Sequence, residues 1–87
     1  MKPFALLVVF DVFEFLERLP RKEQLGIHER FLQIRDFPLN YSDYSEPDDS
    51  GRLFEINIYG KFAIKYWTDH LDQQVKIFDI HPADRKK

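Results

Sequence analysis

The sequence predicts one α+β domain, in which an N-terminal strand and a helical hairpin pack on one face of a mainly antiparallel sheet of four strands. Residues 12–36 repeat apolar side chains at helical spacing, whereas residues 52–80 change to the period of two that is typical of strands. The chain has 87 residues, and a chain of this length builds only one hydrophobic core. We therefore expect residues 1–87 to form a single domain.

The composition excludes several kinds of site. There are no cysteines, which excludes disulfides and thiol nucleophiles and indicates a reducing, cytoplasmic setting. The formal net charge is −2 and the cations are scattered, which argues against strong non-specific binding to nucleic acid. His28 is expected to be partly buried, whereas His70 and His81 lie far from it in the sequence. We therefore expect no metal site, and no cofactor.

The apolar run from Phe4 to Phe10 predicts a strand rather than a signal peptide or a membrane segment. Asp11 and Glu14 interrupt its apolar character, and no cleavage site of small residues follows. Asp11 with Glu14 three residues later is typical of a capping box, so a helix is expected to begin near residue 12. The inner face of this helix carries Val12, Phe15, Leu16 and Leu19.

Pro20 separates this helix from a second one. Proline removes a hydrogen bond inside a helix but suits the first turn of a new one. The second helix is expected over residues 21–36, and Pro38 ends it. Its inner stripe consists of Ile27, Phe31 and Ile34, with Leu25 and Leu32 beside it.

Residues 39–51, LNYSDYSEPDDSG, predict a long polar loop. The segment is rich in acids and turn-forming residues. Its acids lack the alternation and the terminal Glu of an EF-hand loop, so we expect a solvated acidic loop rather than a calcium site.

Three strands are expected after the loop. The first begins at Arg52, the second spans residues 62–67, and the last spans residues 75–80 after a turn at residues 69–73. The last strand is almost continuously apolar, as is the N-terminal strand. We therefore expect both to lie inside the sheet, where they can pair with each other.

The length of the turn at Gly60 decides which side chains share a face. A two-residue turn would place Lys65 on the face of Ile56, whereas a turn one residue longer aligns the apolar sides of both strands. We prefer the longer turn. The helix-facing side then carries Phe54, Ile56, Ile58, Phe62, Ile64 and Tyr66. The open side carries Glu55, Asn57, Ala63, Lys65 and Trp67.

The stretch RLFEINIYGKFAIKYWTDHLDQQVKIFDIHPADR combines an alternating strand, a Gly-containing turn, a strand ending in an aromatic residue, an acidic turn, and a final strand leading to a basic residue. Together with the helical hairpin joined at Leu19-Pro20, this order resembles the RelE/ParE superfamily of toxin-antitoxin toxins over nearly the whole chain. The resemblance implies a RelE/ParE-like fold and the toxin of a bacterial type II toxin-antitoxin pair. Its partner would be an antitoxin whose disordered or helical segment wraps the domain and covers the open face.

The resemblance also directs attention to particular positions. In the ribonuclease branch of the family, Lys and Arg on the open face and an Arg after the last strand hold the mRNA phosphates. The cationic positions of the second strand fall on Glu55 and Asn57 here, and the Arg that opens the third strand falls near Ala63. Only Arg85 keeps its type, and the C-terminal Tyr of many members has no counterpart.

Cleavage of RNA at its 2′-hydroxyl needs a base, a proton donor and cations for the developing phosphate charge. Lys65 and Arg85 are candidates to clamp a phosphate, and His81 or Glu55 to move protons, so these four form the candidate catalytic set. Two further residues are candidates for substrate binding, Trp67 by stacking a base and Arg52 by clamping a phosphate.

Each candidate also has a simpler interpretation. His81 can be a strand-end histidine in water, and Trp67 can be an edge of the core. Arg52 and Arg85 can pair with the acidic loop instead of a phosphate.

Three functions therefore remain open. The first is an endoribonuclease that cleaves ribosome-bound mRNA. The second is a non-enzymatic toxin of the ParE type, which would bind DNA gyrase. The third is a diverged, non-toxic domain that only binds other proteins.

Overall fold

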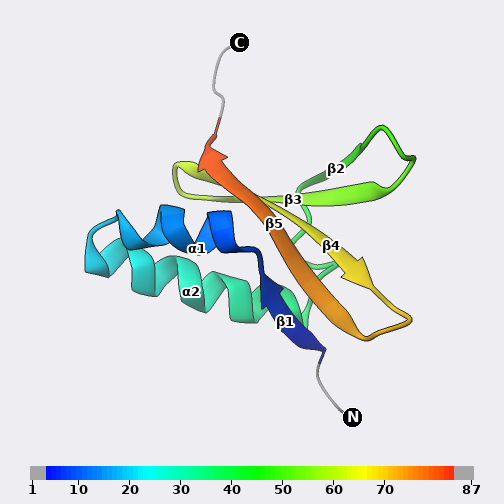
Figure 1. Cartoon of the computed structure of the whole chain (residues 1–87), viewed down its shortest axis with the longest axis horizontal. Helices are drawn as coiled ribbons and strands as arrows, with labels where there is room; N and C mark the ends of the chain where they lie inside the picture. The colour runs from blue at the N-terminus through cyan, green and yellow to red at the C-terminus, as the bar shows by residue number, and fades with distance from the viewer. Residues whose placement is uncertain (1–3, 84–87) are drawn as a thin grey trace.

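A helical hairpin packed on one face of a five-stranded sheet is the architecture of residues 4–83, the part of the chain that the computed structural model describes (Figure 1). The elements in chain order are β1 (Ala5–Val8), α1 (Phe10–Glu17), α2 (Arg21–Asp36), β2 (Tyr44–Pro47), β3 (Leu53–Tyr59), β4 (Phe62–Asp69) and β5 (Gln74–Pro82). The strand order is β1-β5-β4-β3-β2, and only the pair of β1 with β5 is parallel. The α+β class is confirmed, whereas the sheet has five strands instead of the predicted four.

β1 lies at one edge of the sheet. It pairs in parallel with β5, so the predicted pairing of the first and last strands is confirmed. The predicted interior position of β1 is wrong, because no strand of residues 4–83 lies on its other side. Leu6 and Val8 pack on the core, whereas Leu7 is 43% exposed on the opposite side of the strand. The continuous apolar run therefore reflects an edge strand with one side in the core.

α1 begins one residue before the predicted cap. Its N-cap is Val9, which makes no side-chain cap, and Asp11 lies in the first turn. The predicted capping box is wrong: the N-cap is Val9, directly after β1, and its N–H still donates to the carbonyl of Ile77 in β5 at 3.2 Å. The carboxylate of Asp11 still lies near the positive end of the helix dipole.

α2 has the predicted bounds, with Pro20 as its N-cap. Its predicted inner stripe, Ile27, Phe31 and Ile34, is fully buried. Leu25 does not join this stripe and is 57% exposed. None of the helices in residues 4–83 is both long and apolar enough to cross a membrane.

β2 lies within the segment that was expected to be a solvated loop, and it pairs with β3. The carboxylate of Asp48 organises the turn between them, since Oδ1 accepts hydrogen bonds from the Ser50 hydroxyl at 2.7 Å and from the N–H groups of Ser50 and Arg52 at 2.9 Å. The Ser50 hydroxyl is the main cause of a lowered pKa of Asp48. Gly51 completes the turn with a φ of 88°. The acidic segment therefore encodes a hairpin.

The turn between β3 and β4 has two residues, Gly60 and Lys61, so the predicted longer turn is wrong. Lys65 lies opposite Ile56, and Asn57 lies opposite Ile64. Gly60 has a φ of 58°, which suits a two-residue hairpin turn. In the predicted register, Phe54 and Ile56 of β3 would face the helices. In the structure they are buried on the opposite face of the sheet.

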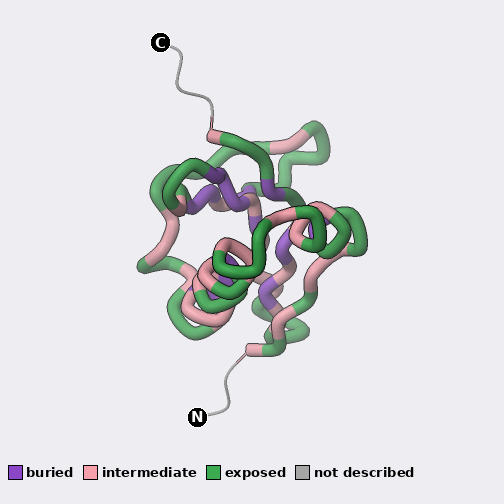
Figure 2. The backbone as a smooth tube through the Cα atoms, turned by 90° about the vertical axis from the view of Figure 1, so that its left-hand side faces the viewer, coloured by how far each residue is buried: buried purple, intermediate pink, exposed green. Residues whose placement is uncertain are grey.

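The main core lies between the helices and the sheet, as the buried segments in Figure 2 show. It consists of Val12, Ile27, Phe31, Ile34, Phe62, Ile64, Tyr66, Val75, Ile77 and Ile80. Phe54, Ile56 and Ala63 are also buried, but on the other side of the sheet. Both faces of the sheet therefore contain buried apolar side chains.

Candidate functional site

The sheet side that faces away from the helices carries aromatic and charged side chains, and we call it the open face. Directly opposite residues of neighbouring strands share a face. Lys65 lies opposite Ile56 and Asp79, whereas Trp67 lies opposite Lys76. By this register the aromatic and charged residues of the open face include Tyr44, Glu46, Phe54, Lys65, Trp67, Asp69, Lys76, Asp79 and His81, and the apolar Ile56, Ile58 and Ala63 lie on the same side.

Trp67 is the centre of a cationic cluster on this face. The guanidinium carbon of Arg52 lies 4.3 Å from the centroid of its ring, and Nζ of Lys76 lies 5.1 Å from it. Both distances are within the range of cation–π attraction. Arg52 forms no ion pair with a carboxylate within residues 4–83. Its charge does contribute, after the Ser50 hydroxyl, to the lowered pKa of Asp48 in the acidic segment. An aromatic ring and two cations thus lie together on an open sheet.

Lys65 lies beside this cluster, over an aromatic floor. Its Nζ lies 4.7 Å from the centroid of the Phe54 ring and 3.9 Å from Oε1 of Glu46. Phe54 in turn contacts Phe78 edge to face, with ring centroids 4.9 Å apart. The pairing of β4 with β5 shifts by one residue next to Lys65, so that Phe78 has no partner in β4 and is free to reach Phe54.

His81 lies near the end of β5, opposite Ala63, and is exposed. Its Nδ1 is 3.0 Å from the carbonyl oxygen of Pro82, and its Nε2 is 4.0 Å from Oδ2 of Asp79. A carbonyl oxygen only accepts, so the contact with Pro82 is a hydrogen bond when Nδ1 carries the proton. In the neutral ring, Nε2 is then the nitrogen that can accept a proton from a ligand.

Glu55 does not belong to the open face, which corrects its expected position. It lies opposite Tyr66, on the side of the helices. Its carboxylate accepts hydrogen bonds from the hydroxyl of Ser42 and, at 2.8 Å, from that of Ser45. Its location follows from the two-residue turn at Gly60, because a register change of one residue moves every side chain to the other face.

Asn57 is displaced for the same reason, and it is only 3% exposed. It therefore has no access to a ligand on the open face. Ala63, Lys65 and Trp67 do lie on the open face, as expected. Arg85 lies outside the described residues.

Lys76 and Phe78 are open-face residues that the sequence interpretation did not include. The alternation of Val75 and Ile77 with Lys76 carries the signal that could have identified it. We instead interpreted residues 75–80 as an almost continuously apolar strand, in which Lys76 was not assigned to a face.

Nearly every cation of the open face has an acidic neighbour. Lys65 lies 3.9 Å from Glu46, and Lys76 lies 3.7 Å from Asp69. The ions compensate one another, so the face is not a simple basic patch. In residues 4–83 no group of three or more His, Asp or Glu side chains that could hold a metal ion occurs.

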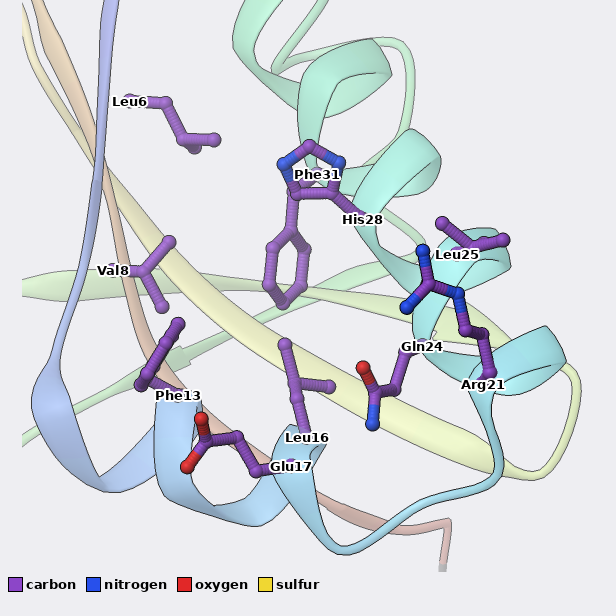
Figure 3. A pocket seen from close by; sticks show the side chains of 10 residues that line it. All are labelled: Leu6, Val8, Phe13, Leu16, Glu17, Arg21, Gln24, Leu25, His28 and Phe31. Atoms are coloured by element: carbon purple, nitrogen blue, oxygen red, sulfur yellow. The ribbon is translucent and has the colours of Figure 1, made fainter.

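A second surface feature lies on the side of the helices, where β1, α1 and α2 surround a pocket of about 450 Å³ that we call the helical groove (Figure 3). Phe13 and Leu25 line it and are 52% and 57% exposed. His28 lines it as well and is exposed, so its expected partial burial is wrong. The other lining residues are Leu6, Val8, Leu16, Glu17, Arg21, Gln24 and Phe31.

The sequence matches no protein-family model and no curated protein. The fold does match solved structures. A chain of the RelE-RelB complex from Pyrococcus horikoshii OT3 aligns with a TM-score of 0.82 and 16% identity, over 98% of this chain and 100% of that one. The chain has a RelE-type fold.

Two further toxin-antitoxin complexes share this RelE-type fold. RelBE2 from Mycobacterium tuberculosis aligns with a TM-score of 0.76 and 15% identity, over 94% of this chain and 100% of that one. The intact E. coli RelBE complex aligns with a TM-score of 0.71 and 10% identity, over 94% and 99%. The resemblance to RelE toxins is therefore confirmed for the fold. A shared fold does not imply a shared chemistry, which depends on the residues that this chain carries on its open face.

Proposed function

We propose that this RelE-type chain is the toxin of a type II toxin-antitoxin pair and that its open face binds and cleaves messenger RNA at the ribosome. The observation that supports the proposal is the cluster of Arg52, Trp67 and Lys76 on an uncovered sheet. Aromatic rings among cations are typical of surfaces that bind single-stranded nucleic acid, because bases stack on the rings while the cations attract phosphates.

Five residues have definite tasks in this proposal. Trp67 stacks a base, and Arg52, Lys65 and Arg85 bind phosphates. Nε2 of His81 takes the proton of the 2′-hydroxyl, whose oxygen then attacks the neighbouring phosphorus. The bond from phosphorus to the 5′-oxygen breaks, which leaves a 2′,3′-cyclic phosphate, and the departing 5′-oxygen takes a proton from water. The cations stabilise the charge that develops on the phosphate. A positioned base of this kind contributes about 10²-fold to 10⁴-fold to the rate.

The proposed partner is an antitoxin, since three solved structures to which this chain is similar are complexes of RelE with RelB. An antitoxin segment on the open face would block the RNA site. The helical groove offers a second apolar contact for the same chain, with the exposed side chains of Phe13 and Leu25 available to an amphipathic segment.

The experiment that tests the proposal is induced expression in bacteria, with growth and the 5′ ends of translated mRNAs as readouts. We expect growth arrest and new mRNA ends, and we expect His81→Ala and Arg85→Ala each to weaken both effects by at least tenfold. His70→Ala is the matched control, because His70 is an exposed histidine in the turn between β4 and β5. If both variants poison cells as strongly as the wild type, the assignment of the site is wrong.

A non-enzymatic toxin of the gyrase-binding type is the second candidate. The observation that favours it is the compensation of Lys65 and Lys76 by carboxylates, together with the displacement of Glu55 from the open face. In that case induction stops growth and stalls DNA supercoiling while mRNA stays intact. Normal growth with neither effect would favour the non-toxic binding domain.

A further inference from the structure

Glu46 reaches the cationic surface from β2, the strand that the sequence did not predict. It lies opposite Phe54 of β3. Its Oε1 is 3.9 Å from Nζ of Lys65, which belongs to β4. The Glu46 side chain therefore extends past the Phe54 ring, over which Nζ of Lys65 also lies at 4.7 Å. Without β2 no carboxylate would occupy this position.

Glu46 differs from the other acid that pairs with a lysine on this face. Asp69 is partly buried, with a side chain 13% exposed, and its Oδ1 also accepts a hydrogen bond from the N–H of Asp72 at 3.2 Å. Asp69 thus holds the turn between β4 and β5. The side chain of Glu46 is 48% exposed, and within residues 4–83 its carboxylate makes no hydrogen bond and a single ion pair, to Lys65. Glu46 therefore has no evident structural task.

The contact between Glu46 and Lys65 is easily broken. A charge-assisted N–H···O bond is about 2.7 to 2.9 Å long, whereas these two atoms are 3.9 Å apart. Exposed ion pairs of this kind add little to stability. A phosphate oxygen that approaches Lys65 would therefore compete with the carboxylate for the same ammonium group.

We propose that Glu46 competes with RNA phosphates for Lys65 and so sets the affinity of the open face for RNA. The inference rests on the proposed function, and it names the residue that tunes the site. A ligand that offers only phosphates gains little binding free energy from Lys65, because Glu46 already neutralises it. A single strand that also stacks a base on Trp67 gains enough binding free energy to displace the Glu46 carboxylate.

The variant Glu46→Gln removes the charge and keeps the size of the side chain. We expect it to bind RNA about threefold to tenfold more tightly at low salt, as the loss of one nearby like charge predicts. Without the Glu46 carboxylate, Lys65 can neutralise one more phosphate. The slope of the logarithm of the RNA binding constant against the logarithm of the salt concentration therefore becomes steeper by up to about 0.7 for a single strand.

The test measures binding of the full chain to a fluorescently labelled single-stranded RNA by anisotropy over a series of salt concentrations. Glu29→Gln is the matched control, since it makes the same change at an exposed position of α2, on the side of the helices. Circular dichroism spectra check that each variant is folded. Equal affinities of Glu46→Gln and Glu29→Gln would overturn the inference.

The variants Lys65→Gln and Glu46→Gln/Lys65→Gln complete a double-mutant cycle. If Glu46 acts through Lys65, its replacement strengthens binding in the wild type and has no effect in the Lys65→Gln background. An equal gain in both backgrounds means general repulsion and refutes the role of Lys65. If neither the wild type nor any variant binds RNA, the proposed function itself fails. This result differs from an RNA affinity that stays the same when Glu46 is replaced.

Discussion

Nη1 of Arg30 lies 3.1 Å from Oδ1 of Asn57, and this hydrogen bond joins α2 to the sheet beneath it. Asn57 also donates from Nδ2 to the carbonyl of Tyr41 at 2.8 Å. The guanidinium of Arg30 lies against the rings of Tyr41 and Tyr59, 4.8 and 4.7 Å from their centroids. Asn57 thus anchors a polar network inside the fold.

Asn57→Ala is expected to lower the free energy of unfolding by about 2 kcal/mol, because it leaves buried polar partners without hydrogen bonds. Urea unfolding followed by circular dichroism measures the change. Asn40→Ala is the control at an exposed position and should stay within about 0.5 kcal/mol of the wild type. A stability of Asn57→Ala equal to that of the control would contradict the anchoring role.

Tyr66→Phe tests a buried hydroxyl. Tyr66 is fully buried, and its hydroxyl donates to the carbonyl of Pro38, which ties the segment after α2 to β4. Loss of this bond is expected to cost about 1 kcal/mol of unfolding free energy at neutral pH. Thermal and urea unfolding at pH 7 measure it.

The same tyrosine predicts a pH effect. Burial raises the pKa of Tyr66 far above the ordinary value of 10.0. Above pH 10 the unfolded chain loses this proton whereas the folded chain keeps it, so stability falls as pH rises, by up to about 1.4 kcal/mol per pH unit. The Tyr66→Phe variant has no phenol at this position, so this loss of stability is absent from it. We therefore expect the stabilities of wild type and variant to converge between pH 10 and 11, and curves that stay parallel would argue against a protonated, buried phenol.

Gly26→Ala tests the close approach of α2 to β3. A Cβ at Gly26 would lie 2.5 Å from the hydroxyl oxygen of Tyr59. Alanine normally stabilises a helix interior by about 1 kcal/mol relative to glycine, but here the clash is expected to reverse the sign and lower the unfolding temperature. In the Tyr59→Phe background the hydroxyl is absent, and Gly26→Ala should become neutral or stabilising. The same loss in both backgrounds would rule out this contact as the cause.

Trp67→Ala tests the stacking platform of the open face. Base–aromatic stacking is worth about 1 to 3 kcal/mol per base, so we expect RNA affinity to fall roughly tenfold or more in anisotropy measurements. Trp67→Phe keeps an aromatic face and should retain most of the affinity. If the Trp67→Ala and Trp67→Phe variants bind RNA with equal affinity, no base stacks on this side chain.

Elements whose signals are local could be predicted from the sequence. Pro20 and Pro38 bound α2 because proline cannot continue a helix, and Ile27, Phe31 and Ile34 form its buried stripe because their spacing matches the helical turn. The pairing of the first and last strands and the resemblance to RelE toxins also follow from patterns along the chain.

Features that depend on contacts between distant segments could not be predicted in the same way. The turn at Gly60 is one residue shorter than expected, and this difference places Glu55 and Asn57 on the helix side of the sheet instead of the open face. β2 exists because Asp48 organises a turn and β3 offers its backbone as a partner, neither of which hydrophobic periodicity records.

The sequence by itself therefore determined the α+β class, the helical hairpin and the aromatic and cationic residue types, since these depend on steric preference and periodicity within a few neighbouring residues. Only the tertiary structure decided which of those residues share a surface. Trp67 meets Arg52 and Lys76, and Lys65 meets Glu46, because strand register and the added edge strand bring together side chains from separate parts of the chain.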